Sequence, residues 1–328
     1  MQLHRYPNNP ILMPQSDSPW ESGAVFNPGA ALGQDGRFYL LYRAIPAGYT
    51  PFPDRPGYQN YISSIGCAVS DDGIHFTRFA QPVIEPSEPY DQHGCEDPRV
   101  TQLEIEGRVL YLITYTALSA PAWSGMGDRV ALASTEDFRA YTKYGVAIPE
   151  LKDKDAVIFP ELIGGRIAML HRVEPDIQIV YFDDFDHLVH PDEAFWREYR
   201  AHLEDYVVMR PQFDWEAEKI GSGCPPVKTA EGWLLIYHAK DDKGIYRAGV
   251  ALLDLEEPAR VIARSPYPIL EPKMAYERIG DVNNVVFPQG AVIKDDIIYV
   301  YYGAADKVCC LATAKLDDLV DFVAQFKA

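Results

Sequence analysis

The sequence predicts an all-β protein, a five-bladed β-propeller that ends in a short C-terminal helix. Aromatic residues make up 12% of the 328 residues, with 21 Tyr, and such residues favour strands. The 26 Pro and 23 Gly are typical of a chain with many short turns. The third and strongest observation is that five segments of the chain resemble one another.

Each of these segments has a proline-marked start, a short strand, a tight turn and a second apolar strand with a polar end. The segments span residues 27–44, 97–117, 155–172, 223–239 and 287–306. Alignment of the second strands makes the following residues equivalent: Arg43, Tyr115, Arg172, His238 and Gly303. Their spacings of 72, 57, 66 and 65 residues are typical of a propeller blade, which is a four-stranded sheet.

A second set of similar segments supports the repeat. Residues 10–14, 82–86 and 268–272 share a Pro-bounded apolar pattern that is typical of a connector between blades. Five blades account for the whole chain, so we expect a single domain over residues 1–328. Helix is expected only around residues 191–206 and in the tail. Apolar residues of the tail fall at helical spacing and are expected to cover the rim of the propeller: Leu316, Leu319, Val320, Val323 and Phe326.

Charge and cysteine content exclude several classes of function. The net charge of −18 argues against nucleic acid or an acidic membrane as a partner, because phosphate groups require a basic surface. The five cysteines lack a CxxC spacing, and no apolar run is long enough to span a membrane. We therefore expect a cytoplasmic protein with no membrane partner. The eight His lack an HExxH spacing, so no metal is expected.

Residues 94–100 are the strongest candidate for a functional site. Glu96, Asp97 and Arg99 surround Pro98 just before an apolar run, and charged groups at the start of a buried strand must be paired or must bind a ligand. A simple Asp97–Arg99 ion pair is the alternative. In a propeller the inner strands begin near the axis, so equivalent residues converge on one funnel. Those residues are Asn27, Asp97 and Asp155, together with Arg43, Arg172, His238 and Asp306 from the second strands.

Carboxylates and aromatic residues around one funnel suggest cleavage of a glycosidic bond. A hydrolase needs a second carboxylate to activate water, whereas a phosphorolytic enzyme needs cations to bind phosphate. Lys154, Arg172 and His238 could form such a cationic clamp, although the alternative for each is a salt bridge or a satisfied polar group of the core. The loops at residues 45–61 and 119–128 are expected to overhang the funnel. Four aromatic residues could stack on sugar or simply pack the blades: Tyr90, Tyr115, Trp123 and Trp215.

Taken together, these stretches resemble glycoside hydrolase family 130, the mannoside phosphorylases and related mannosidases, which are five-bladed β-propellers. The matching stretches follow the family's order over nearly the whole chain: Trp20-Glu21, 25–30, 41–44, 94–99, 154–161, 169–172, Tyr237-His238, 280–282, 286–288 and 302–306. The Glu-Asp-Pro-Arg sequence at residues 96–99 is the most specific of them.

The resemblance implies inverting phosphorolysis of a β-mannoside oligosaccharide to α-mannose 1-phosphate, with inorganic phosphate as co-substrate and no other cofactor. Asp97 would be the single catalytic acid. The mannosyl unit would be bound by Arg43, Arg99, Asp306, Asn27 and Asp155. Phosphate would be bound by Arg172, His238 and Lys154. The resemblance also implies that the chain can form homo-oligomers.

One position departs from the family pattern, since many of its phosphorylases carry Arg-Asn where this chain has Lys152-Asp153. An acidic residue there is expected to weaken phosphate binding. A β-mannosidase therefore stays open as an alternative, with Asp306 or Glu161 as the base. A non-catalytic glycan-binding propeller is the third possibility.

Overall fold

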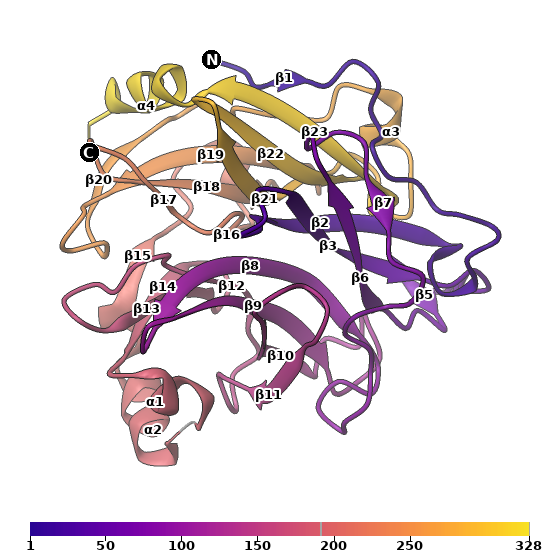
Figure 1. Ribbon diagram of the computed structural model, residues 1–328, viewed down its shortest axis with the longest axis horizontal. Helices are drawn as coiled ribbons and strands as arrows, with labels where there is room; N and C mark the ends of the chain where they lie inside the picture. Colours follow the sequence, from indigo (N-terminus) through magenta and orange to yellow (C-terminus); the bar gives the residue numbers. More distant parts are fainter. Residues whose placement is uncertain (191, 328) are drawn as a thin grey trace.

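Five antiparallel sheets surround a common axis in the computed structural model, which describes residues 1–190 and 192–327 (Figure 1). Blade 1 contains β2 (Ala24–Leu32), β3 (Phe38–Ile45), β6 (Ser64–Ser70) and β7 (Thr77–Arg78). Blade 2 contains β8 (Cys95–Ile105), β9 (Arg108–Leu118), β10 (Asp128–Thr135) and β11 (Thr142–Val146). Blade 3 contains β12 (Lys154–Ile158), β13 (Ile167–Arg172), β14 (Ile177–Phe182) and β15 (Val207–Met209). The predicted five-bladed propeller is confirmed.

The last two blades complete the ring, and the final one uses both ends of the sequence. Blade 4 contains β16 (Lys219–Ser222), β18 (Trp233–Lys240), β19 (Tyr246–Leu253) and β20 (Val261–Arg264), with β17 (Val227–Lys228) beside β18. Blade 5 contains β21 (Val286–Lys294), β22 (Ile297–Ala304), β23 (Val308–Lys315) and β1 (His4–Arg5). The pairing of His4 with Thr313 and of Arg5 with Ala312 makes β1 the outer strand of blade 5. The sequence repeat did not predict that the N-terminal strand would complete the last blade and close the ring.

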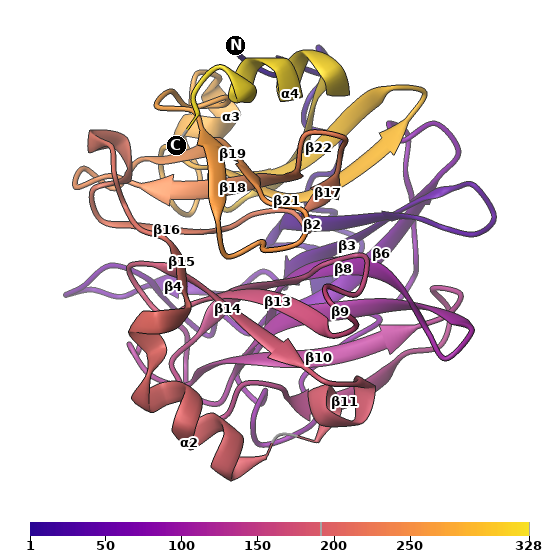
Figure 2. The same ribbon diagram turned by 90° about the vertical axis from the view of Figure 1, so that its left-hand side faces the viewer.

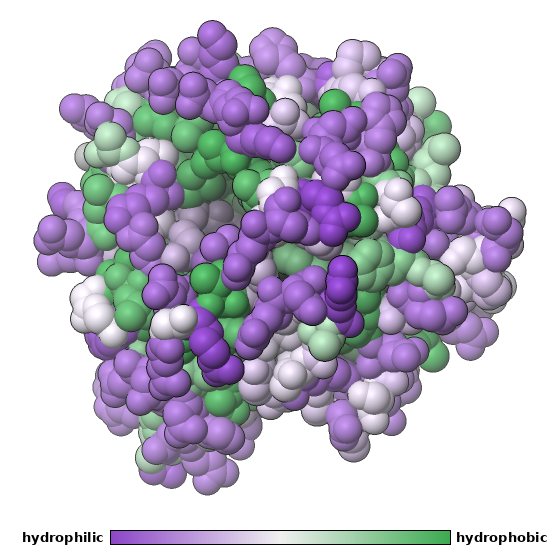
Figure 3. All heavy atoms as spheres, in the orientation of Figure 1, coloured by the Kyte–Doolittle hydropathy of each residue, from purple (hydrophilic) through white to green (hydrophobic). Residues whose placement is uncertain are grey.

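The hydrophobic core is divided into five main clusters, one between each pair of neighbouring blades. Alternate side chains of a strand point to opposite faces of its sheet, so a long central strand can contribute to two clusters. Leu40 of β3, for example, packs toward blade 5, whereas Leu41 packs toward blade 2. Hydrophilic side chains make up most of the periphery on the face shown in Figure 3, as expected for a chain of net charge −18.

Inner strands of the first three blades share a bulge at the same position, and this bulge shapes the site. The pairing of β2 with β3 skips residues 27 and 28, that of β8 with β9 skips 97 and 98, and that of β12 with β13 skips 155 and 156. The first residue of each bulge has a positive φ: 50° at Asn27, 53° at Asp97 and 57° at Asp155. Asn and Asp tolerate this conformation better than other non-glycine residues. The bulge therefore explains why these residue types occur there.

The bulges also correct the predicted alignment of the blades. Phe26, Glu96 and Lys154 directly precede the three bulges and pair with Arg43, Thr116 and Arg172. Thr116, rather than Tyr115, is therefore the blade-2 equivalent of Arg43. The predicted connectors are confirmed, since Leu12, Ile84 and Leu270 each form an isolated bridge to a third strand of the adjoining blade.

Helices are few and lie outside the blades. The predicted stretch at 191–206 contains α2 (Glu193–Ala201) and the 3₁₀ turn η2 (Leu203–Tyr206), preceded by the unpredicted α1 (Phe185–Val189); residue 191 lies outside the described residues. The short elements α3 (Ala275–Arg278), η1 (Pro19–Glu21) and η3 (Asp214–Glu216) lie between blades. As predicted, the tail forms a helix, α4 (Leu316–Ala324), and it packs on blades 4 and 5 at the opposite end of the molecule from α2 (Figure 2).

Candidate active site

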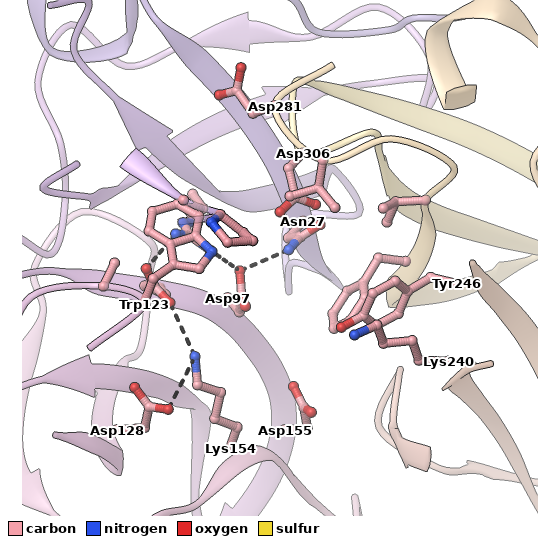
Figure 4. A pocket seen from close by; sticks show the side chains of 18 of the residues that line it. Asn27, Asp97, Trp123, Asp128, Lys154, Asp155, Lys240, Tyr246, Asp281 and Asp306 are labelled. Atoms are coloured by element: carbon pink, nitrogen blue, oxygen red, sulfur yellow. Dashed lines mark hydrogen bonds and ion pairs between the residues drawn. The ribbon is translucent and has the colours of Figure 1, made fainter. Parts of the chain in front are cut away.

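A cavity of about 670 Å³, lined by many charged side chains, gathers residues from all five blades (Figure 4). Seven of the nine predicted site residues line it: Asn27, Arg43, Asp97, Lys154, Asp155, Arg172 and Asp306. The lining has six basic residues (Arg43, Lys152, Lys154, Arg172, Lys219, Lys240) and seven acidic ones (Glu96, Asp97, Asp128, Asp155, Glu174, Asp281, Asp306). The cavity is therefore close to charge balance within a strongly acidic protein.

Asp97 has one carboxylate oxygen that is fixed by the protein and one that is free. Its Oδ1 accepts hydrogen bonds from Nδ2 of Asn27 at 2.9 Å and from Nη1 of Arg43 at 3.4 Å. Its Oδ2 has no hydrogen-bond partner among residues 1–190 and 192–327. A carboxyl group that is held by one oxygen and open at the other is suited to give a proton to a bound substrate.

The side chain of Glu96 links Arg43, which contacts Asp97, to Lys154. It forms ion pairs with Arg43 and, at 3.5 Å, with Nζ of Lys154, which also lies 3.6 Å from Oδ2 of Asp128. Burial raises the pKa of Glu96, while Arg43 and Lys154 act against that shift. Burial opposes the charge of Lys154, but Glu96 and Asp128 raise its pKa overall. Lys154 therefore stays charged between the two carboxylates.

Asp155 occupies the same bulge position as Asp97 but is surrounded by bases. Its carboxylate lies 2.7 Å from Nη2 of Arg99, 2.6 Å from Nη1 of Arg172 and 3.3 Å from Nε2 of His238. Burial alone would raise the pKa of Asp155, but these three bases hold it well below its usual range. Asp155 is therefore a permanent anion that orients Arg172.

Two of the predicted ligands, Arg99 and His238, lie behind the cavity wall rather than on it. The guanidinium of Arg99, which is only 1% exposed, donates to the backbone carbonyls of Asp97, Ser222 and Gly223. Its carboxylate partner is Asp155, so the alternative of an Asp97–Arg99 side-chain ion pair is wrong. Burial lowers the pKa of His238 to about 4, which leaves its ring neutral.

The basic side of the cavity contains residues that the sequence did not single out. Nη2 of Arg172 lies 3.2 Å from Glu174, which in turn pairs with Nζ of Lys219 at 2.7 Å. Lys219 pairs across the sheet with Lys240, and both line the cavity beside Tyr246. The sequence could have indicated both lysines, because Lys240 lies two residues after His238 and Lys219 begins the inner strand of the same blade. Lys152 and Asp281 also line the cavity. The sequence drew attention to Lys152 only as a departure from the family pattern and to residue 281 only within a matching stretch, so neither was predicted as a site residue.

Asp153, the residue expected to weaken phosphate binding, is sequestered. Its Oδ2 lies 2.6 Å from Nδ1 of His171, and its Oδ1 accepts the backbone N–H of Arg172 at 3.0 Å. Its side chain is fully buried, both of its oxygens are hydrogen-bonded, and it is not part of the cavity lining. Lys152, the other residue that departs from the family pattern, adds a positive charge to the cavity lining.

The two candidate bases for hydrolysis differ in position. Asp306 lines the cavity, and burial raises its pKa to about 7, with Arg43 acting against that shift and Asp97 adding to it. Glu161 is half-exposed, pairs with Lys228 and is not part of the cavity lining. Of the two, only Asp306 is placed to act on a ligand in this cavity.

The predicted overhanging loops do reach the cavity. Residues 45–61 form a small hairpin of β4 (Thr50–Pro51) and β5 (Tyr58–Gln59), and Tyr58 lines the cavity with Trp123 of the second loop. A Cβ at Gly57 would lie 2.5 Å from the indole of Trp123, so only glycine allows the two loops to pack together. The other aromatic candidates, Tyr90, Tyr115 and Trp215, are not in the lining.

A five-bladed propeller with an open carboxyl group and several cations in one cavity defines a class of enzyme that acts on a polar, sugar-sized substrate. A family model described as beta-1,4-mannooligosaccharide phosphorylase matches residues 2–325. The chain belongs to this family, glycoside hydrolase family 130.

Individual relatives agree with the family match. The chain is 40% identical to a 1,2-beta-oligomannan phosphorylase of Thermoanaerobacter sp. (strain X514), over 97% of this chain and 99% of that one. A beta-1,2-mannobiose phosphorylase from Listeria innocua, solved with beta-1,2-mannobiose, is similar with a TM-score of 0.81 and 28% identity, covering 98% and 99% of the two chains. A structure reported with glycoside hydrolases of the same family that target beta-1,2 mannosidic linkages has a TM-score of 0.79 and 27% identity, covering 96% and 94%.

Among the residues that the structure describes, no helix has the length and apolar character needed to cross a membrane.

Proposed function

We propose that this protein is an inverting phosphorylase that cleaves a β-1,2-linked manno-oligosaccharide with inorganic phosphate, giving α-mannose 1-phosphate and a shortened oligosaccharide. The relatives named as phosphorylases of 1,2-beta-oligomannan and beta-1,2-mannobiose support this linkage. No cofactor other than inorganic phosphate is included in the proposal. The five described cysteines are free and buried, which suits the cytoplasm in which we place the enzyme.

One observation carries the proposal: a carboxyl group with an open oxygen and a group of cations line the same cavity. In the proposed reaction, an oxygen of phosphate attacks the anomeric carbon of the terminal mannose and the glycosidic C–O bond breaks. Asp97 gives its proton to the leaving oxygen, directly or through a hydroxyl group of the sugar. Attack from the face opposite the leaving group inverts the configuration.

The remaining residues have proposed roles in binding. Arg43, Asn27 and Asp306 surround Asp97 and would bind the mannosyl unit. Phosphate would lie against Arg172, Lys154 and Lys219, whose charges offset its own. Because Arg99, His238 and Asp155 lie behind or beside these residues, they would act by orienting Arg172 and the bulge of Asp97.

The test is an assay of β-1,2-mannobiose, β-1,2-mannotriose and β-1,4-mannobiose with and without inorganic phosphate. We expect mannose 1-phosphate from the β-1,2-linked substrates, and only when phosphate is present. Free mannose at the same rate without phosphate would contradict the proposal and favour a β-mannosidase with Asp306 as the base. No product from any mannoside would favour a glycan-binding propeller without catalytic activity.

A further inference from the structure

Four of the five blades contain the same buried group, which we call the blade anchor. In each, a tyrosine of the second strand donates its hydroxyl to a carboxylate that precedes the inner strand. The pairs are Tyr42–Glu21 at 2.8 Å, Tyr115–Asp91 at 3.3 Å, Tyr237–Glu216 at 2.6 Å and Tyr302–Glu277 at 2.9 Å. Each carboxylate also pairs with a cation of the outer strand of its blade: Arg78, Lys143, Arg264 and Arg5. These anchors join the inner and outer edges of a blade.

Blade 3 has a different anchor. His171 replaces the tyrosine, and its Nδ1 lies 2.6 Å from Oδ2 of the carboxylate of Asp153. The outer strand β15, with the sequence Val-Val-Met, has no cation. In its place the hydroxyl of Tyr199, from α2, lies 2.6 Å from Nε2 of His171. The helix beside blade 3 therefore provides the third member of this anchor.

The anchor of blade 3 is also the one that reaches the active site. Oδ1 of Asp153 accepts the backbone N–H of Arg172 at 3.0 Å. Within residues 1–190 and 192–327, none of the other four carboxylates bonds the backbone N–H of the residue that follows the anchor tyrosine. Asp153 thus fixes the main chain at the residue whose guanidinium lines the cavity.

The hydrogen bonds of the blade-3 anchor run in a defined direction. The hydroxyl of Tyr199 donates to the backbone carbonyl of Ile179 at 2.9 Å, so it must accept from Nε2–H of His171. The remaining contact, 2.6 Å between Nδ1 of His171 and Oδ2 of Asp153, is then a hydrogen bond in which either group can be the donor. The side-chain polar atoms of Asp153, His171 and Tyr199 all have hydrogen-bond partners, and the three residues are buried. A fully satisfied buried network of this kind favours one arrangement of its members.

We propose that Asp153, His171 and Tyr199 form a positioning device for Arg172 that sets the affinity of the site for phosphate. The inference rests on the proposed function, in which Arg172 binds phosphate. The side chain of Arg172 is already held by Asp155 and Glu174. The anchor adds control of the backbone from which that side chain extends. A small displacement of a binding group is enough to reduce affinity strongly.

The experiment compares Asp153→Ala with Asp91→Ala, the same substitution in the anchor of blade 2, which lies outside the cavity lining. We measure the binding of inorganic phosphate by calorimetry, the KM for phosphate in phosphorolysis, and the melting temperature. Both variants should lose thermal stability, because each leaves buried partners unpaired. Only Asp153→Ala should weaken phosphate binding, by about tenfold, with a matching rise in KM and little change in kcat. Equal phosphate affinity in Asp153→Ala and Asp91→Ala would overturn the proposal.

Two further variants keep the test decisive if Asp153→Ala does not fold. Asp153→Asn keeps every hydrogen bond, because its amide can donate to a neutral His171 whose Nε2–H still donates to Tyr199. It should bind phosphate nearly as the wild type does. Tyr199→Phe removes one bond at the far end and should weaken phosphate binding about threefold, whereas wild-type affinity in this variant would contradict the proposed device.

The failure of the proposed function is recognised separately. If the wild type binds phosphate but releases no mannose 1-phosphate, the phosphorylase proposal fails while the positioning device is still tested by calorimetry. If the wild type does not bind phosphate, both proposals are wrong.

Discussion

Asp97 and Asp155 occupy the same place in two neighbouring blades, yet their surroundings differ in kind. Both residues begin a bulge of an inner strand, with φ values of 53° and 57°. Asp97 has one amide and one guanidinium beside a single oxygen, and its other oxygen is open. Asp155 has two guanidinium groups and an imidazole around it. The repeat fixes where a carboxylate is placed, whereas the neighbouring blades decide whether it can react.

Asp97→Asn is expected to have the largest effect on activity. The amide preserves the shape of the bulge and the contact with Asn27 but has no acidic proton to transfer. General acid catalysis contributes about 10²–10⁴-fold, so we expect kcat to fall by about a thousandfold with little change in melting temperature. Initial rates of phosphorolysis and a thermal melt measure both quantities. Activity near that of the wild type would remove Asp97 from the reaction.

Asp155→Asn tests the other member of the pair and should act mainly on stability. The substitution leaves Arg99 and Arg172 without their shared anion, and breaking a buried ion pair costs about 3–5 kcal/mol. Because the pKa of Asp155 is lowered in the folded state, its contribution is present above the pKa of the unfolded chain and is lost as the pH falls. The stability difference between wild type and variant, measured by denaturant unfolding, should therefore shrink in acid. A constant difference at all pH values would contradict this assignment.

Asp306→Asn should have a smaller effect that depends on pH in the opposite direction. The pKa of Asp306 is raised to about 7, so the folded protein binds a proton that the unfolded chain releases at lower pH. Wild-type stability should consequently fall as the pH rises from about 5 to about 8, by roughly 2–3 kcal/mol from this group. The neutral amide removes that slope. Melting curves of both proteins across this range decide the matter, and parallel pH profiles would show that Asp306 does not titrate there.

Much of the fold could be predicted because residue types with strong backbone preferences recur at equivalent positions of the blades. Asn27, Asp97 and Asp155 were found because they begin equivalent segments of the repeat, and the structure adds that a bulge with positive φ favours Asn or Asp at this place. The one-residue error at Tyr115 arose because an alignment of strand ends cannot detect which residue precedes a bulge. Position 303 breaks the series of polar residues for a steric reason, since a Cβ there would lie 1.8 Å from Oδ1 of Asn27.

Other parts of the site could not be predicted because they depend on packing between blades. Arg99 belongs to the most specific sequence motif, but it is not part of the cavity lining. Its guanidinium binds the carboxylate of Asp155, which does line the cavity. Lys219 and Glu174 become part of the site only when blades 3 and 4 lie side by side. The anchor carboxylates could have been found, since an acidic residue precedes each inner strand: Glu21, Asp91, Asp153, Glu216 and Glu277.

The pairing of β1 with β23 has a consequence for how the molecule is made. Blade 5 joins residues that are more than three hundred positions apart, so it cannot be completed during synthesis until the last strand has left the ribosome. Earlier blades can pair their own strands beforehand, but the circle stays open at one seam. A circular permutation that moves the new ends into the turn of another hairpin would shift this delay to a different blade while leaving the finished ring unchanged.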